Sequence, residues 1–256
     1  MDLFDASCIV TGGASGLGEA TAEMLCSRGA RVVIIDVDSI RGVVTAKRIG
    51  AQFARADVSD TDEVAASISL AKSLGPLRVL VNCAGITRVG RMVSSDGVPF
   101  DLAQFREVVN VNLVGTFNCA RLAAAAMAVT PVLDSGDRGV IVNTASAAAH
   151  EGQIGQVAYT ASKGAIVAMT LVLARDLAQH GIRVNTISPG MFETPIFEQL
   201  ADPVSVKQNL TTEIVHPARL GRPEEYAAMV SAIIDNDYLN GEVIRLDGAL
   251  RLRKRA

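Results

Sequence analysis

The sequence contains no tryptophan and few aromatic residues of any kind. Phenylalanine, tyrosine and tryptophan together make up 4% of its 256 residues, so the hydrophobic core must be built from aliphatic side chains. Hydrophobic residues nevertheless amount to 49% of the chain, which excludes an intrinsically disordered protein. The length suits one large α/β domain as well as two small domains.

Cysteine and histidine are also scarce, and neither is grouped. Cys8, Cys26, Cys83 and Cys119 form no CxxC pair and have no ligand-like spacing to the three histidines. This pattern predicts free thiols in a reducing compartment and no metal site.

The chain has no excess of positive charge and no long hydrophobic run. Its formal net charge of −3 gives no electrostatic reason to expect a nucleic-acid partner. The apolar run Leu122–Val129 is far shorter than the 18 or more residues of a membrane-spanning helix, so we expect no membrane partner either. The first seven residues contain two acids and no basic segment, so we expect a cytoplasmic protein without a targeting peptide.

Short β-branched runs alternate with helix-length segments from end to end. The predicted strands are Cys8–Val10, Arg31–Ile35, Gln52–Ala56, Leu77–Val81, Gly139–Asn143, Arg183–Ile187 and Glu242–Leu246. The predicted helices are Glu19–Arg28, Asp62–Leu74, Leu102–Val129 and Val157–His180. Most of the strands are apolar on both faces, which is typical of a parallel sheet covered by helices on both sides.

This alternation predicts an α/β fold, a Rossmann-like doubly wound parallel sheet in a single domain over residues 1–256. Two segments, Thr87–Asp101 and Met191–Arg222, break the alternation. Irregular stretches of that length are typical of functional loops, and we expect the second to be a substrate lid.

Glycines cluster directly after the first predicted strand, in the run Thr11-Gly-Gly-Ala-Ser-Gly-Leu-Gly18. At a strand-to-helix turn, glycines let the backbone approach a pyrophosphate, and the helix N-terminus offers free N–H groups to the phosphates. The predicted cofactor-binding residues of this turn are Gly12, Ser15, Gly16, Leu17 and Gly18.

Asp36 ends the second predicted strand, where a carboxylate can accept hydrogen bonds from an adenosine ribose. A 2′-phosphate at this position would meet a like charge, and the neighbouring Val37 supplies no cation, so we expect NAD rather than NADP. The alternative is an ordinary turn or capping aspartate. Further predicted cofactor contacts after the later strands are Asp57, Val58, Asn82, Cys83, Ala84 and Gly85.

Tyr159 and Lys163 are four residues apart in a predicted helix and therefore lie on one face of it. Ser146 follows the strand that ends at Asn143, so all three side chains can meet at the mouth of the sheet. A tyrosine with a pKa of ~10 is a poor base at neutral pH. A lysine cation ~4 Å away, at an effective dielectric of ~20, supplies the roughly 4 kcal/mol that lowers this pKa by about three units. We therefore expect Tyr159 to exchange a proton with an alcohol while Ser146 holds the substrate oxygen.

These motifs resemble the short-chain dehydrogenase/reductase family over essentially the whole chain. They are the T-G-x3-G-x-G turn, an N-x-A-G at Asn82–Gly85, and the S…Y-x3-K set. The resemblance implies that Asn112 completes a catalytic tetrad by supporting a water through which the lysine relays protons. It also implies contacts with the nicotinamide end of the cofactor from Tyr159, Lys163, Pro189, Gly190, Phe192 and Thr194.

Within that family, residues 143–164, the N-C-A-G variant and residues 239–249 resemble the 3-hydroxyacyl-CoA dehydrogenase branch. The resemblance implies NAD-dependent conversion of 3-hydroxyacyl-CoA to 3-oxoacyl-CoA, side activity on hydroxysteroids, and a homotetramer. Animal members are mitochondrial, whereas this N-terminus has no transit pattern, so we expect a bacterial relative. The alternatives are a dehydrogenase of hydroxysteroids or other hydrophobic secondary alcohols, and a non-catalytic NAD-binding regulator.

The predicted substrate contacts are Ser146, Gln153 and Tyr159. Gln153 either bonds a thioester or keto oxygen or holds its own loop, and the sequence favours neither. Ile196, Phe197 and Leu200 in the predicted lid either line an acyl pocket or pack the lid onto the domain, and packing is the simpler interpretation.

Overall fold

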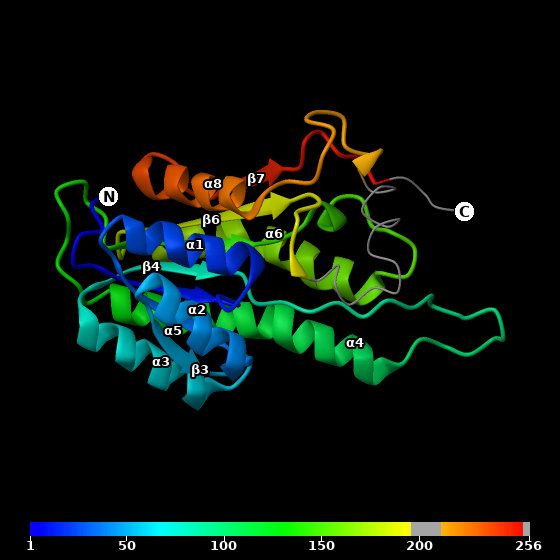
Figure 1. Cartoon of the computed structure of the whole chain (residues 1–256), viewed down its shortest axis with the longest axis horizontal. Helices are drawn as coiled ribbons and strands as arrows, with labels where there is room; N and C mark the ends of the chain where they lie inside the picture. The colour runs from blue at the N-terminus through cyan, green and yellow to red at the C-terminus, as the bar shows by residue number, and fades with distance from the viewer. Residues whose placement is uncertain (196–210, 253–256) are drawn as a thin grey trace.

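The aliphatic runs form a single parallel sheet in the computed structural model, which describes residues 1–195 and 211–252 (Figure 1). Within these residues the sheet has seven strands in the order β3-β2-β1-β4-β5-β6-β7. The strands are β1 (Ser7–Thr11), β2 (Arg31–Asp36), β3 (Gln52–Arg55), β4 (Leu77–Asn82), β5 (Gly139–Thr144), β6 (Ile182–Pro189) and β7 (Val243–Leu246). All neighbouring strands pair in parallel, which confirms the predicted doubly wound sheet.

Helices cover both faces of this sheet. They are α1 (Gly16–Ser27), α2 (Ser39–Ile49), α3 (Thr61–Leu74), α4 (Leu102–Val109), α5 (Thr116–Met127), α6 (Val157–Ala178) and α8 (Pro223–Asp235). Successive side chains of a strand point to opposite faces, so Cys8 and Val10 pack with α1, α2 and α8, while Ile9 packs with α3, α5 and α6. The core is aliphatic, as the composition predicts.

The predicted helix Leu102–Val129 is not one uninterrupted α-helix. Between α4 and α5 lies η1 (Asn110–Gly115), a π-helical turn in which the backbone keeps right-handed helical angles at both boundaries. The prediction was wrong there because apolar periodicity does not distinguish an α-helix from one that carries a single wide turn. The segment containing Asn112 is therefore one residue out of step with a regular helix.

The two predicted irregular segments have different outcomes. Residues 87–101 contain no helix or strand apart from an isolated bridge between Val93 and Pro99, and they project beyond the sheet ahead of α4 (Figure 1). Of the predicted lid, residues 191–195 and 211–222 are described. Ile196, Phe197 and Leu200 lie outside the described residues.

Helix α6 is, among the described residues, the one helix long and apolar enough by length and composition to span a membrane. In this fold it packs against β6 and α4, and its first turns carry Tyr159 and Lys163. Its apolar side chains therefore pack along the sheet on one side and form an exposed apolar face on another.

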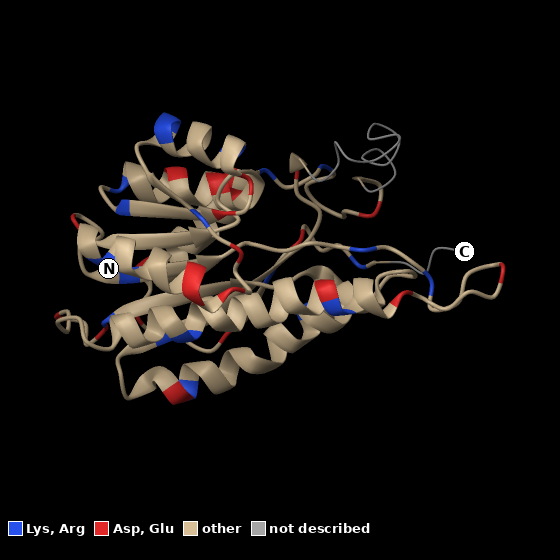
Figure 2. Cartoon of the chain, turned by 90° about the horizontal axis from the view of Figure 1, so that it is seen from below, with Lys and Arg blue, Asp and Glu red and all other residues tan. Residues whose placement is uncertain are grey.

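A buried arginine joins three parts of the fold at the opposite, amino-terminal end of β6. The Arg183 guanidinium donates to Asp137 Oδ2 at 2.8 Å and to the carbonyls of Ile233, Ile234 and Leu239. Both members of the Arg183–Asp137 pair are buried. Other charged residues, of both signs, are interspersed over the helices (Figure 2).

Candidate active site

The glycine-rich turn after β1 lies against the residues that follow β4. Gly12 has a φ of +63°, and a Cβ built on it would lie 2.7 Å from the backbone nitrogen of Ala84. A Cβ on Gly18 would overlap the carbonyl oxygen of Gly12. Both glycines are therefore required by close backbone contacts, as the sequence predicts for a turn that approaches a phosphate.

Helix α1 begins at this turn without a side-chain cap. Three other helices, α2, α3 and α4, begin after aspartates whose carboxylates accept the first backbone N–H groups. At α1 the capping position is Ser15, whose hydroxyl makes no such bond. The N–H groups of Gly16, Leu17 and Gly18 thus lie at the uncapped start of the helix, the arrangement that binds a pyrophosphate.

Asp36 lies beside this turn, at the end of β2. Its carboxylate accepts hydrogen bonds from the backbone nitrogens of Ala14, at 3.1 Å, and Asp38, at 3.0 Å. These bonds fix the carboxylate at the edge of the glycine-rich turn. Asp57, after β3, accepts from the nitrogen and hydroxyl of Ser59, and the neighbouring Val58 contacts the position of a Cβ on Gly115.

The residues at the end of β4 and just after it have two different roles: one joins two strands, and the others border the space near Lys163. Asn82 is buried and donates from Nδ2 to Asn143 Oδ1 at 2.9 Å, so it joins the ends of β4 and β5. Cys83 and Ala84 are held by the backbone and hydroxyl oxygens of Thr11. A Cβ on Gly85 would lie 3.2 Å from Asn112 Oδ1 and 3.5 Å from Lys163 Nζ. Gly85 therefore keeps open the space between these two side chains.

The structure brings together the predicted catalytic side chains. Lys163 Nζ donates to the carbonyl oxygen of Thr144 at 2.7 Å and lies 5.8 Å from the centre of the Tyr159 ring. Ser146 hydrogen-bonds to Tyr159 and caps the short 3-10 helix η2 (Ala147–Ala149). Gln153 lies between η2 and α6, and its contact with the substrate stays a prediction.

Asn112 is fully buried and is fixed by its own hydrogen bonds. Its Oδ1 accepts from the nitrogen of Ile86 at 2.8 Å, and its Nδ2 donates to the carbonyl of Ile86 and to Ser162 Oγ. Both protons of the amide nitrogen are thus in use, so Oδ1 is the atom that faces Gly85 with spare hydrogen-bonding capacity. Sequence reasoning missed Ser162, which lies next to Lys163 in the helix.

The protonation properties of the pair differ from those expected. Burial raises the pKa of Tyr159, and the hydrogen bond from Ser146 offsets only part of this rise. Burial also lowers the pKa of Lys163 to about 8. The predicted lowering of the tyrosine pKa was wrong for this structure, because that estimate counted the lysine charge but not the loss of water around the phenol. The pair therefore needs further positive charge at the site before Tyr159 is an effective base at neutral pH.

The lowered pKa of Lys163 predicts a pH effect on stability. The unfolded chain binds more protons than the folded protein between about pH 8 and pH 10.4, so Lys163 makes folding more favourable as the pH rises through this range. In urea unfolding, we expect the stability of Lys163→Met relative to the wild type to fall by about 3 kcal/mol across it. Lys72→Met, at an exposed position of α3, is the control and leaves the pH dependence unchanged. A pH-independent difference for Lys163→Met would contradict this prediction.

The segment after β6 crosses back over the glycine-rich turn. Thr194 Cγ2 lies 3.2 Å from the position of a Cβ on Gly16. Gly190, next to Pro189, donates to the carbonyl of Leu246. Phe192 is buried edge-on against Tyr226, with ring centres 6.4 Å apart, so it anchors this segment to the core.

The remaining histidines and cysteines add little to this site. His150 Nε2 lies 3.2 Å from Ser188 Oγ. All four cysteines are free thiols. Within residues 1–195 and 211–252 there is no group of three or more histidine, cysteine or acidic side chains suited to a metal ion.

A glycine-rich turn at an uncapped helix, next to a buried lysine and a tyrosine paired with a serine, is the arrangement of a nicotinamide-dependent oxidoreductase. Residues 6–204 match the family model described as short chain dehydrogenase. The chain belongs to the short chain dehydrogenase family, and it is therefore an oxidoreductase that uses a nicotinamide cofactor.

Two relatives and one solved structure are similar to this chain over nearly its whole length. The chain is 50% identical over 249 residues to 3-hydroxyacyl-CoA dehydrogenase type-2 of Bos taurus, covering 96% of this chain and 95% of the relative. It is 36% identical over 251 residues to ipsdienol dehydrogenase of Ips pini, covering 96% and 97%. The crystal structure of 3-hydroxyacyl-CoA dehydrogenase type-2 from Mycobacterium avium superposes with a TM-score of 0.94, at 43% identity and 98% coverage of both chains.

Proposed function

We propose that this protein interconverts 3-hydroxyacyl-CoA and 3-oxoacyl-CoA with NAD as the hydride carrier. The observation that carries the proposal is the assembled set of Ser146, Tyr159, Lys163 and Asn112. It occurs in a chain half identical, over nearly its whole length, to relatives named for this reaction.

The side chains divide the chemistry between them. Ser146 holds the substrate oxygen, and Tyr159 in its phenolate form accepts the proton of the substrate hydroxyl. The bound cofactor supplies the hydride acceptor and a positive ring charge. Lys163 stabilises the phenolate by its charge, and the Thr144 carbonyl fixes the lysine. In the reductive direction Tyr159 returns the proton to the carbonyl oxygen.

NAD is favoured over NADP by the charge around Asp36. Its carboxylate is held beside the glycine-rich turn by two backbone N–H groups. The nearby Arg41 pairs with Asp38 at 3.7 Å, so its charge is shared with a carboxylate. A 2′-phosphate at this place meets uncompensated negative charge.

Replacing this carboxylate is expected to change the cofactor preference. Asp36→Ala should raise the ratio of kcat/KM for NADPH to that for NADH about tenfold, because it removes a like charge worth about 1.4 kcal/mol. Asp101→Ala is the matched control. It removes the same charge and the cap of α4, away from the glycine-rich turn, and it should change the ratio far less. An unchanged ratio in Asp36→Ala would show that another group selects the cofactor.

The substrate is tested by assaying purified protein with acetoacetyl-CoA and NADH. Oxidation of NADH is the expected result, and none would remove the acyl-CoA proposal. A parallel panel of hydroxysteroids and other secondary alcohols tests the second candidate function. That candidate is favoured by the 36% identity to an enzyme named ipsdienol dehydrogenase.

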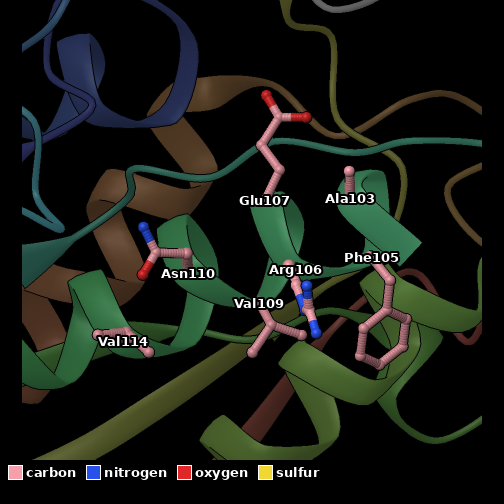
Figure 3. A pocket seen from close by; sticks show the side chains of 7 residues that line it. All are labelled: Ala103, Phe105, Arg106, Glu107, Val109, Asn110 and Val114. Atoms are coloured by element: carbon pink, nitrogen blue, oxygen red, sulfur yellow. The ribbon is translucent and has the colours of Figure 1, made fainter. Parts of the chain in front are cut away.

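The exposed faces of α4, η1, α5 and α6 support assembly as a homotetramer. Val114, Phe117 and Val172 are about half exposed on these elements. Val114 also lines a shallow hollow of about 490 Å³, together with Phe105, Val109 and other residues of α4 and η1 (Figure 3). Burial against copies of the chain would remove this apolar surface from water. Light scattering should give four times the monomer mass of 26.8 kDa, and a monomeric mass would contradict the assembly.

A further inference from the structure

Three neutral hydrogen-bonding groups form a closed ring behind the catalytic lysine. Thr144 Oγ1 donates to Cys83 Sγ at 3.7 Å, and Cys83 Sγ donates to the Tyr226 hydroxyl at 3.7 Å. The Tyr226 hydroxyl and Thr144 Oγ1 lie 2.7 Å apart, so a bond from the tyrosine closes the ring. Each group then donates once and accepts once.

The ring joins three elements that are distant in the sequence. Cys83 directly follows β4, Thr144 is the last residue of β5, and Tyr226 lies in the first turns of α8. Tyr226 has no exposed surface, and its ring packs against Phe192. A phenylalanine would fill this core position as well, so packing alone does not explain why a hydroxyl group is buried here.

The buried ring is linked to the active site through the backbone carbonyl of Thr144. Its carbonyl oxygen accepts the 2.7 Å hydrogen bond from Lys163 Nζ, while its side chain belongs to the ring. Lys163 is buried, with 4% of its surface exposed, so this carbonyl is a principal support of its ammonium group. Burial raises the pKa of both Cys83 and Tyr226, so the ring stays neutral and adds no competing charge.

We propose that Tyr226 is a positioning residue of the active site. Through the ring it fixes the end of β5, so that the Thr144 carbonyl holds the Lys163 ammonium beside Tyr159. Within the described residues, no hydrogen bond joins Tyr226 to either of these two side chains. The inference rests on the proposed roles of Tyr159 and Lys163 but not on the identity of the substrate.

The test is the pH profile of Tyr226→Phe. Losing the hydroxyl leaves the Thr144 side chain and the Cys83 thiol with incomplete hydrogen bonding, so the end of β5 relaxes and the lysine ammonium loses support. We expect the acid limb of kcat/KM for alcohol oxidation to move about one pH unit upward. Activity at pH 7 then falls roughly tenfold, and the difference from wild type narrows at high pH.

Thr186→Val is the matched control. Thr186 Oγ1 lies 2.6 Å from Thr170 Oγ1, and both residues are fully buried, but in the part of the chain that the structure describes neither hydroxyl is hydrogen-bonded to Thr144 or Lys163. The variant removes a buried hydroxyl of the same kind, and its acid limb should not move. Thr144→Val should reproduce the shift of Tyr226→Phe, and the double variant should shift no further, because both changes open the same ring.

A measurement without turnover separates this inference from the proposed function. The chain contains five lysines, and Lys163→Met identifies the signal of Lys163 in a pH titration followed by NMR of 13C-labelled lysines. The midpoint of this signal, about pH 8 in the wild type, reports the support of the Lys163 ammonium directly. It should fall when Tyr226→Phe is added, even if no alcohol tested is a substrate.

The outcomes are distinct. A lower midpoint of the Lys163 titration together with the shifted acid limb supports positioning through the ring. If Tyr226→Phe lowers activity equally at all pH values and leaves the midpoint unchanged, the hydroxyl serves packing alone and the inference is overturned. If Tyr226→Phe is too unstable to measure, an unshifted Thr144→Val overturns it equally. Absence of turnover in the wild type refutes the proposed function, while the titration still decides the role of Tyr226.

Discussion

Tyr159→Phe is expected to lower kcat by about 10³-fold or more while leaving the Kd for NADH within about threefold of the wild type. The variant keeps the ring that packs beside Lys163 and removes only the hydroxyl that exchanges a proton with the substrate. Loss of a positioned acid–base group costs 10²- to 10⁴-fold in rate, and this site offers no second phenol to replace it. Steady-state kinetics and NADH fluorescence titration measure the two quantities.

Tyr238→Phe is the control for this substitution. Tyr238 is fully exposed, so the same loss of a hydroxyl should leave both kcat and NADH affinity unchanged. Undiminished turnover in Tyr159→Phe would refute the assigned mechanism. A parallel loss of NADH binding would instead assign the hydroxyl a mainly cofactor-binding role.

Arg183→Met should reduce the free energy of unfolding by about 3–5 kcal/mol. The guanidinium is buried with Asp137 and donates to three carbonyls at the end of α8 and beyond. Methionine fills much of the same volume, but it leaves Asp137 as a buried charge without its partner. Urea unfolding followed by circular dichroism measures the loss.

Arg31→Met is the matched control for that variant. Arg31 pairs with Asp5 at 2.7 Å, but both side chains are more than half exposed. An exposed pair of this kind contributes at most about 1 kcal/mol. Similar losses in the two variants would mean that burial does not set the strength of the Arg183–Asp137 interaction.

The sheet could be predicted from the sequence because each strand is a local pattern. Short runs that are apolar on both faces, separated by helical stretches, occur only in a few architectures. Helices α2 and α8 were not predicted, although both carry local signals. Asp38 caps α2, and Pro223 begins α8 directly after an irregular segment, which obscured the start of its apolar periodicity.

The features of the active site likewise divide into those that the sequence predicts and those that only the fold determines. Tyr159 and Lys163 share one helix, and their spacing alone places them together. The ring around Thr144 could not be predicted, because Tyr226 lies 82 residues away and only the packing of α8 brings it to β5. The sign of the tyrosine pKa shift was also wrong, because the degree of burial is a property of the assembled fold.

The wide turn η1 has a consequence for how this chain can vary in length. Each helical residue advances the direction of its side chain by about 100°, and the π turn contains one residue more than a regular helix would. Deleting any single residue of Asn110–Gly115 would remove that extra residue and rotate the preceding helix against the following one. A different side chain would then face Ile86 in place of Asn112. Substitutions that preserve the count leave this alignment intact, so in this stretch the number of residues is under stricter constraint than the identity of most of them.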